Sequence, residues 1–171
     1  MDWDLLTEAS ADGDVTATRY KRITQADEFS LGVLLANLRG IDRLELSAIA
    51  RSTRTSIFRS LLHCVQESRV AWKLEVNGNL EGVGGCGHNG KFGSPWLLLS
   101  PCLPEKHGRA FNRLALRCHK IVTKNFAPLF NFVHANSSSH GWLERMGYKI
   151  ARHRPPTILG GEPFFIFSYG D

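Results

Sequence analysis

The sequence lacks any long run of apolar residues. No stretch among its 171 residues approaches the roughly 18 apolar residues that a membrane-spanning helix needs, so we expect no membrane partner. The first residues, Met1 to Asp4, are acidic and show neither the basic segment nor the apolar core of a secretory leader. These two absences favour a cytoplasmic protein.

Cysteine is scarce and widely spaced. Cys86 and His88 would point to the same side of a strand, but no oxyanion-stabilising arrangement accompanies them, so a nucleophilic pair is not favoured. None of the cysteines shows the paired spacing of a structural zinc site, so we expect no metal. We interpret all four as free thiols: Cys64, Cys86, Cys102 and Cys118.

The composition that remains is that of an ordinary globular protein, with 43% apolar and 22% charged residues. We predict an N-terminal extension over residues 1–14, which are acidic and rich in small residues, and a single domain over residues 15–171. The formal net charge is +5 and the isoelectric point is about 9.2. This charge suggests a polyanionic partner, such as nucleic acid, an acidic protein or a phosphorylated cofactor.

The spacing of apolar residues predicts an α/β chain in the order β-α-α-β-β-β-α-β-α-β-β. The expected strands are 15–23, 70–76, 80–85, 96–100, 129–135, 148–153 and 163–169. The expected helices are 24–38, 42–67 with a break near 52–55, 105–126 and 138–147. Asn77-Gly78 is a strong signal for a two-residue hairpin between the second and third strands.

The first expected helix has its own start and stop signals. Thr24 stands three residues before Asp27, as in a capping box, and Gly40 is suited to end the helix. The residues expected to share its buried face are Phe29, Val33, Leu34 and Leu38.

A glycine-rich segment over residues 85–92 (GCGHNGKF) approaches the pattern of a phosphate-binding P-loop. Phe92 stands where that loop requires a hydroxyl for Mg²⁺, and a strand follows where a helix must start. A hairpin or a bulge is therefore the better interpretation.

A more coherent signal follows the strand expected at 96–100. The segment Glu105-Lys106-His107-Gly108-Arg109-Ala110 places two small residues, Gly108 and Ala110, at the start of the long helix. The N–H groups at a helix start have no partner within the helix, and the helix dipole there favours an anion such as a diphosphate. Lys106 and Arg109 add positive charge, whereas Glu105 adds negative charge. Simple packing of the helix start is the alternative explanation.

The second segment with a coherent pattern runs from Asn136 to Tyr148 (NSSSHGWLERMGY). Asparagine and serine are preferred at a helix start, and Gly147 is suited to the helix end. Ordinary capping therefore explains these residue types but not where they stand in the chain.

Together with the element order, the two segments resemble the GCN5-related N-acetyltransferases. The residues that match the two motifs of that family are Gly108, Ala110, Asn136, Ser139, Gly147 and Tyr148. The resemblance implies an α/β fold with a mixed, mostly antiparallel central sheet flanked by helices. It also implies a splay between the fourth and fifth strands.

The resemblance implies the transfer of an acetyl group from acetyl-CoA to an amine of a protein or a small molecule. The residues it implies for holding acetyl-CoA are Leu99, Ser100, Cys102, Lys106, His107, Gly108, Arg109, Ala110, Asn136 and Ser139. Glu81 and His134 are candidates for the base that accepts the proton of the amine. Leu143 stands where the family has a proton-donating tyrosine, so no acid is assigned.

Two alternatives stay open. A looser resemblance to the acetyltransferase-like internal virion proteins of T7-like phages implies a host-cytoplasmic or virion protein that uses this fold without catalysis. Glu105 and Leu143 favour that alternative. The other rests on a basic stripe that would contact nucleic acid or an acidic partner, unless it is a solvated outer face: Lys106, Arg109, Arg113, Arg117, Lys120 and Lys124.

Overall fold

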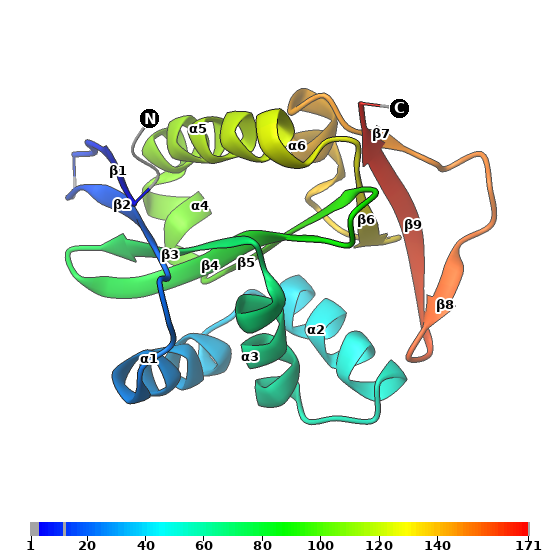
Figure 1. Ribbon diagram of the computed structural model, residues 1–171, viewed down its shortest axis with the longest axis horizontal. Coiled ribbons are helices and arrows are strands. Elements are labelled where there is room, and N and C mark those ends of the chain that lie inside the picture. The colour runs from blue at the N-terminus through cyan, green and yellow to red at the C-terminus, as the bar shows by residue number, and fades with distance from the viewer. Residues whose placement is uncertain (1–3, 12, 171) are drawn as a thin grey trace.

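One sheet with helices on both faces organises the chain (Figure 1). The computed structural model describes residues 4–11 and 13–170. The strands are β1 Leu5–Glu8, β2 Val15–Arg19, β3 Val70–Val76, β4 Asn79–His88, β5 Gly93–Leu99, β6 Leu129–His134, β7 Lys149–Ile150, β8 Thr157–Leu159 and β9 Glu162–Tyr169. The helices are α1 Gln25–Ala36, α2 Gly40–Ser52, α3 Ile57–Glu67, α4 Cys102–Lys106, α5 Gly108–Phe126 and α6 His140–Arg145.

The strands lie in the order β1-β2-β3-β4-β5-β6-β9-β7, and β8 pairs with β9. Every described pair is antiparallel except β5 with β6, which run parallel. The predicted mixed, mostly antiparallel sheet flanked by helices is therefore confirmed. In Figure 1, α4, α5 and α6 lie on one face of the sheet and α1, α2 and α3 on the other.

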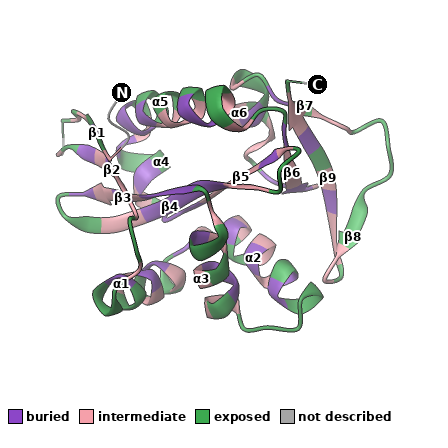
Figure 2. Cartoon of the chain, in the orientation of Figure 1, coloured by how far each residue is buried: buried purple, intermediate pink, exposed green. Residues whose placement is uncertain are grey.

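The sheet separates two hydrophobic clusters. One lies between the sheet and α5, and it includes Trp72, Phe111 and Leu114. The other lies between the sheet and α1 and α3, and it includes Leu34 and Leu61. Figure 2 shows that the buried residues concentrate on the strands and on the inward sides of the helices. Two layers of helix on one sheet therefore bury both of its faces.

The predicted capping box at the start of α1 is confirmed. The Asp27 N–H donates to Thr24 Oγ1 at 3.2 Å, and the Thr24 N–H donates to Asp27 Oδ2 at 2.9 Å. The Asp27 carboxylate also forms an ion pair with Lys73 on β3. This pair holds one particular side of α1 against the sheet.

The predicted inward face of α1 is only half right. The orientation set by Asp27 turns the residues four and seven positions later towards the sheet, because these positions share one side of a helix. The apolar residues that are buried there are Leu31, Leu34 and Leu38. Phe29 and Val33 are 76% and 48% exposed, so their placement in the core was wrong.

Two predicted helix boundaries are also corrected. Gly40 begins α2 instead of ending α1, because Asn37 ends α1 with its N–H bonded to Leu34 O. The helix expected over 105–126 is divided at His107 into α4 and α5. His107 has φ −117° and ψ 19°, which interrupts the helical backbone.

Part of the expected N-terminal extension belongs to the sheet. Leu5–Glu8 forms the edge strand β1, which pairs with β2. The Glu8 carboxylate bonds Arg113 at 2.9 Å and Arg117 at 3.1 Å on α5. The middle of the exposed basic stripe is therefore bonded to β1, and binding of the stripe to an external anion stays a prediction.

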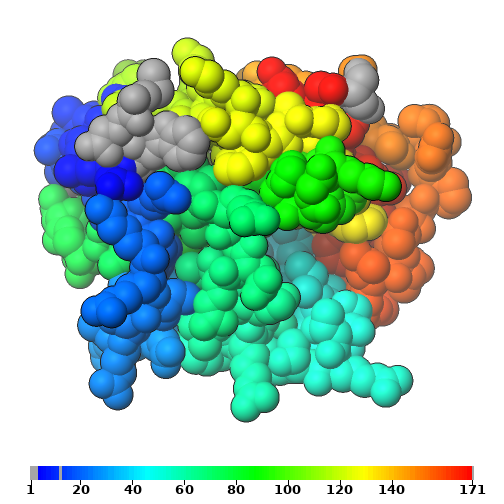
Figure 3. Space-filling view, viewed as in Figure 1, coloured from blue at the N-terminus to red at the C-terminus, as the bar shows by residue number. Residues whose placement is uncertain are grey.

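The two hairpins that flank β4 agree with the sequence. Asn77 and Gly78 form a two-residue turn with positive φ angles of 50° and 79°. The glycine-rich segment 85–92 is the end of β4 and the turn into β5, so it is no P-loop. In Figure 3 this turn lies against the end of α5, where the ring centroids of His88 and Phe126 are 5.8 Å apart.

Candidate functional site

The parallel strands β5 and β6 separate soon after they meet. Their pairing is confined to Gly93, whose N–H donates to Pro128 O at 2.9 Å. Two residues further along β5, Pro95 has no N–H to continue the ladder. The Asn131 side chain fills this position, since its Nδ2 donates to Pro95 O and its Oδ1 accepts the Phe132 N–H, each at 2.8 Å. The narrow end of the splay is thus closed by one amide side chain.

The wide end of the splay is spanned by α2 (Figure 1). Asp42 Oδ2 accepts the Leu99 N–H of β5 at 2.9 Å, and the Arg39 N–H donates to Leu99 O at 2.9 Å. Glu45 Oε1 accepts the His134 N–H of β6 at 2.9 Å. Two carboxylates one helical turn apart therefore bond the opposite edges of the splay.

Between these two ends, Leu97 presents an unpaired stretch of backbone. The Ser100 N–H donates to Glu81 O at 2.8 Å, and ladder bonds to β4 then fall on every second residue of β5. Leu97 therefore directs its N–H and C=O away from β4, as Leu99 does. No described residue bonds either group of Leu97.

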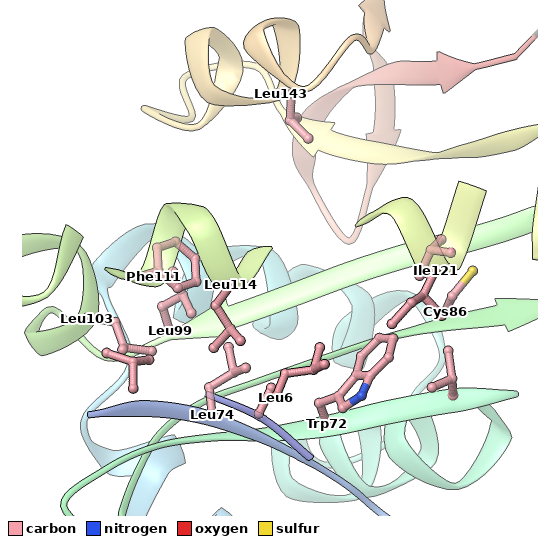
Figure 4. Close-up of a cluster of buried hydrophobic side chains, with 14 of the residues drawn as sticks. Leu6, Trp72, Leu74, Cys86, Leu99, Leu103, Phe111, Leu114, Ile121 and Leu143 are labelled. Atoms are coloured by element: carbon pink, nitrogen blue, oxygen red, sulfur yellow. The ribbon is translucent and has the colours of Figure 1, made fainter. Parts of the chain in front are cut away.

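A cavity of about 690 Å³ occupies the splay, and residues of both helical layers line it. Pro104 of α4 lines it, together with Gly108 at the start of α5 and Cys118 further along α5. Figure 4 shows Phe111 and Leu114 on α5 above Leu99 of β5, with Leu143 on α6 apart from them. On the other side of the sheet, the lining includes Glu45, Ile49 and Ser52 of α2 and Leu159 of β8.

Glu45 has an altered acidity. Burial raises the pKa of its carboxyl to about 7, the bond from the His134 N–H lowers it, the Asp42 charge raises it, and Arg39 lowers it. Its second oxygen has no hydrogen-bond partner among the described residues. A carboxyl that titrates near neutral pH and has a free oxygen in a cavity wall can accept a proton.

The α5 and α6 side of the cavity holds a second polar pair. The Tyr148 hydroxyl and His119 Nδ1 are 3.3 Å apart, and both residues line the cavity. Burial raises the pKa of Tyr148 and lowers the pKa of His119, so each is held in its neutral form near pH 7. Leu143 is buried in the same wall.

Three of the residues predicted to hold acetyl-CoA line the cavity: Leu99, Gly108 and Ser139. The backbone of Leu99 is already bonded by Asp42 and Arg39, whereas the free backbone groups are those of Leu97. No described side chain caps the start of α5 at Gly108.

The other predicted residues at the end of β5 bond one another. The Ser100 hydroxyl donates to the Glu81 carboxylate and accepts the Cys102 N–H at 3.2 Å. Glu81, a candidate base, therefore bonds Ser100 outside the cavity lining. Its role as a base stays a prediction.

The remaining residues of the predicted diphosphate loop point in different directions. Lys106 and Arg109 are exposed, whereas His107 and Ala110 are buried. His107 Nδ1 lies 2.8 Å from the Ser10 hydroxyl, so the N-terminal segment packs against this loop. Positive charge and a helix start thus lie together, as predicted, and their binding of a diphosphate is untested.

Asn136 and the second candidate base, His134, lie at the end of β6. The exposed Asn136 donates its N–H to His134 Nδ1 at 3.1 Å. A neutral His134 ring therefore has its hydrogen on Nε2, which lies 3.3 Å from Glu162 Oε2. Neither side chain is in the cavity lining, and both roles stay predictions.

The described cysteines are all free, and no group of three His, Cys, Asp or Glu residues in the described ranges could hold a metal ion. Burial raises the pKa of the Cys86 and Cys118 thiols to about 12, which leaves them protonated and weakly nucleophilic. No helix within the described part of the chain is long and apolar enough to cross a membrane.

Three residues of the splay were not predicted from the sequence: Glu45, Leu97 and Asn131. Glu45 had no signal of its own, because the backbone N–H that it accepts belongs to His134, 89 residues away. Leu97 and Asn131 had none, since their roles depend on where the pairing of β5 with β6 stops.

Comparison with known proteins agrees with this architecture. No protein-family model and no curated protein matches the sequence. Several solved structures match the fold of this chain, and one is an acetyltransferase from Streptococcus agalactiae 2603. That protein is 15% identical with a TM-score of 0.64, and the match covers 90% of this chain and 96% of that one.

Two further solved structures match at similar levels. A Desulfovibrio desulfuricans protein assigned to the GNAT family is 12% identical with a TM-score of 0.56, covering 90% of this chain and 98% of that one. The spermidine N-acetyltransferase of Vibrio cholerae, in complex with CoA and spermine, is 15% identical with a TM-score of 0.59, covering 90% and 94%. The chain therefore has the fold of the GCN5-related N-acetyltransferases.

Proposed function

We propose that this protein is an acyl-CoA-dependent N-acetyltransferase. The observation that carries the proposal is the unpaired N–H and C=O of Leu97 in the cavity of the splay. Free backbone groups on a strand edge bind an extended ligand with amide groups, as an added strand would. The pantetheine arm of CoA is such a ligand. The fold shared with acetyltransferases supports the same choice.

Residues of the cavity and its mouth would hold the donor. Leu97 would pair with the pantetheine amides, and Ser139 at the start of α6 would lie beside them. The start of α5 at Gly108, with Lys106 and Arg109 nearby, would hold the diphosphate through N–H groups and positive charge. When bound, acetyl-CoA supplies an activated thioester, from which the acetyl group passes to an amine nitrogen. The acceptor is an amine of a protein or a small molecule.

Titration calorimetry with acetyl-CoA tests the proposal, with Leu97→Pro as the informative variant. Proline removes the free N–H and is tolerated at a strand position that lacks a ladder bond. Loss of one hydrogen bond corresponds to binding weakened about tenfold. Leu97→Val keeps the N–H and should bind like the wild type. If the wild type produces no heat with 1 mM acetyl-CoA, the proposal is refuted, because the Kd would then be weaker than about 1 mM.

A non-catalytic protein is the second candidate, and Leu143 favours it. This buried side chain lines the cavity but has no proton to donate to a leaving thiolate. The protein would then serve assembly or host interaction, for example inside a phage particle. Stoichiometric incorporation into a particle, with no CoA in the purified protein, would support this candidate over the enzyme.

A further inference from the structure

Part of the α2 side of the cavity is apolar. Ile49 on α2, Leu159 on β8 and Phe164 on β9 all line it. The turn between β8 and β9 is fastened to α2, because Arg51 Nε donates to Gly160 O at 2.7 Å. Gly160 has a positive φ of 55° and packs so closely on Ala48 that a Cβ would clash with Ala48 O. This wall is therefore fixed, and it suits a carbon chain.

The carboxylates on this side of the cavity differ in whether they have a cationic partner. Asp42 is bonded by the Arg39 guanidinium, with Nε on Oδ2 at 2.7 Å and a terminal nitrogen on Oδ1 at 2.8 Å. Glu162 has Arg51 at 3.5 Å and His134 at 3.3 Å. Glu45 forms no ion pair with any described residue. It is thus a carboxylate that lacks a cation in a largely apolar cavity.

We propose that Glu45 is the catalytic base and that the acceptor is a protonated alkylamine, with its ammonium on Glu45 and its carbon chain against Ile49 and Leu159. This inference rests on the proposed function. An ammonium supplies the missing countercharge, which is worth more in an apolar cavity than in water. The apolar walls bind methylene groups and exclude a second charge.

Glu45 can then take a proton from the bound amine. One N–H bond of the ammonium breaks, its electron pair stays on nitrogen, and the proton forms an O–H bond with the free carboxylate oxygen. The other oxygen keeps its bond to the His134 N–H, which fixes the orientation of the side chain. The proton then passes to solvent, and the neutral amine nitrogen attacks the carbonyl carbon of the thioester. The C–S bond breaks with its electron pair on sulfur, and the second N–H proton of the amine ends on that departing thiolate, so the products are an N-alkylacetamide and the CoA thiol.

The expected pH dependence follows from the groups that face Glu45. These are Asp42 and Arg39 on its own side of the splay and His134 on β6, with Arg51 and Glu162 beyond them. The base must be ionised, so kcat/KM should rise through the Glu45 pKa of about 7. Removal of the base should lower kcat about 100-fold or more.

The test compares Glu45→Gln with wild type and with Glu67→Gln, a matched change at an exposed residue of α3. Rates are measured with acetyl-CoA and n-butylamine between pH 5.5 and 9. We expect Glu45→Gln to lose the rise near pH 7 and most of kcat while it still binds acetyl-CoA, and Glu67→Gln to keep both. If Glu45→Gln keeps the pH dependence of kcat/KM of the wild type, the inference is overturned. It is also overturned if Glu81→Gln or His134→Gln, instead of Glu45→Gln, loses the rise near pH 7.

A second readout does not depend on turnover. Binding of n-butylammonium is followed by NMR of ¹³C-labelled carboxyl groups, in wild type and in Glu45→Gln. We expect a carboxyl that titrates near pH 7 in wild type only, and butylammonium should shift its resonance. Glycine should not shift this resonance, because its carboxylate would have to lie against the apolar side chains. If acetyl-CoA fails to bind but butylammonium shifts Glu45, the proposed function fails while the amine site stands. No shift would reject the amine site.

Discussion

The two ends of the splay between β5 and β6 are closed by different chemistry. At the narrow end, the uncharged amide of Asn131 satisfies a carbonyl of β5 and an N–H of β6. At the wide end, Asp42 and Glu45 of α2 accept one backbone N–H from each strand. An amide can donate and accept, so one side chain suffices where the strands are close. Two carboxylates are needed where the strands have diverged.

The two carboxylates also differ from one another. The Arg39 guanidinium neutralises Asp42, so that side of the wide end is a structural anchor. Glu45 has only the His134 N–H, and burial holds its pKa at about 7. One helix thus contributes an anchor and a titratable group within a single turn. Burial therefore makes a carboxylate reactive only where it lacks a cation.

The largest expected effect comes from removal of the anchor. Asp42→Ala leaves the Arg39 guanidinium and the Leu99 N–H without their partner, which should lower the free energy of unfolding by about 3 to 5 kcal/mol. Urea denaturation at pH 7 measures this. A loss below about 1 kcal/mol, typical of an exposed ion pair, would mean that α2 is not anchored through Asp42.

Glu45→Gln should instead raise the free energy of unfolding, by an amount that depends on pH. The carboxyl pKa is 4.5 ordinarily and about 7 here, a difference that corresponds to about 3 kcal/mol. Because the folded pKa is raised, wild-type stability is retained below pH 4.5 and falls as pH rises through 7. Glutamine abolishes this fall, so the variant should be more stable than wild type by up to about 3 kcal/mol at pH 8.

Denaturation curves of Glu45→Gln and wild type at pH 4 and pH 8 measure this difference. The two proteins should be nearly equal at pH 4, where both side chains are neutral. If the variant is less stable than wild type at pH 8, the Glu45 carboxylate does not destabilise the fold, which contradicts its raised pKa.

At the narrow end, Asn131→Ala leaves Pro95 O and the Phe132 N–H unpaired. We expect a loss of about 2 kcal/mol that does not vary between pH 5 and 8, because no titratable group is involved. Asn131→Asp keeps an acceptor for the Phe132 N–H, but its ionised carboxylate cannot donate to Pro95 O and repels it, so this variant should lose more at pH 8 than at pH 5. Thermal unfolding at both pH values separates these outcomes. A pH-dependent loss in the alanine variant would show that a titratable group also acts at the narrow end.

The smallest expected effect is at Glu8, which bonds Arg113 and Arg117 outside the splay. All three charges lie near solvent, so Glu8→Gln should lower stability by less than about 1 kcal/mol. Raising the salt concentration to 1 M should remove most of that difference. If Glu8→Gln lowers stability as much as Asp42→Ala does, solvent exposure does not explain why the ion pairs of Glu8 and Asp42 should differ in strength.

Much of the fold could be predicted because the signals are local. The Thr24 capping box and the Asn77-Gly78 turn depend on residues next to one another, and both are confirmed. The buried face of α1 was misjudged, because Phe29 and Val33 are as apolar as the residues that are buried. The ion pair between Asp27 and Lys73 decides which face turns inward, and it joins distant parts of the chain.

The site was harder to predict than the fold. Gly108 and Ser139 follow motif spacing, and both line the cavity. Glu45 could not be assigned from spacing, because its partner at His134 is 89 residues away, and the partner of Asp42 at Leu99 is 57 residues away. No short-range pattern encodes a hydrogen bond over such a separation.

The sequence predicted the order of the main strands and helices, though not β1, β8 or the division between α4 and α5, and it predicted the Thr24 cap, the Asn77-Gly78 turn and the small residues at the start of α5. Each of these follows from the conformational preferences of neighbouring residues. The place where β5 and β6 separate, the backbone groups that stay unpaired and the carboxylate that stays without a cation depend on contacts between distant parts of the chain. Burial and countercharge are set by groups that other elements bring together, so the acidity of Glu45 emerges only in the folded chain.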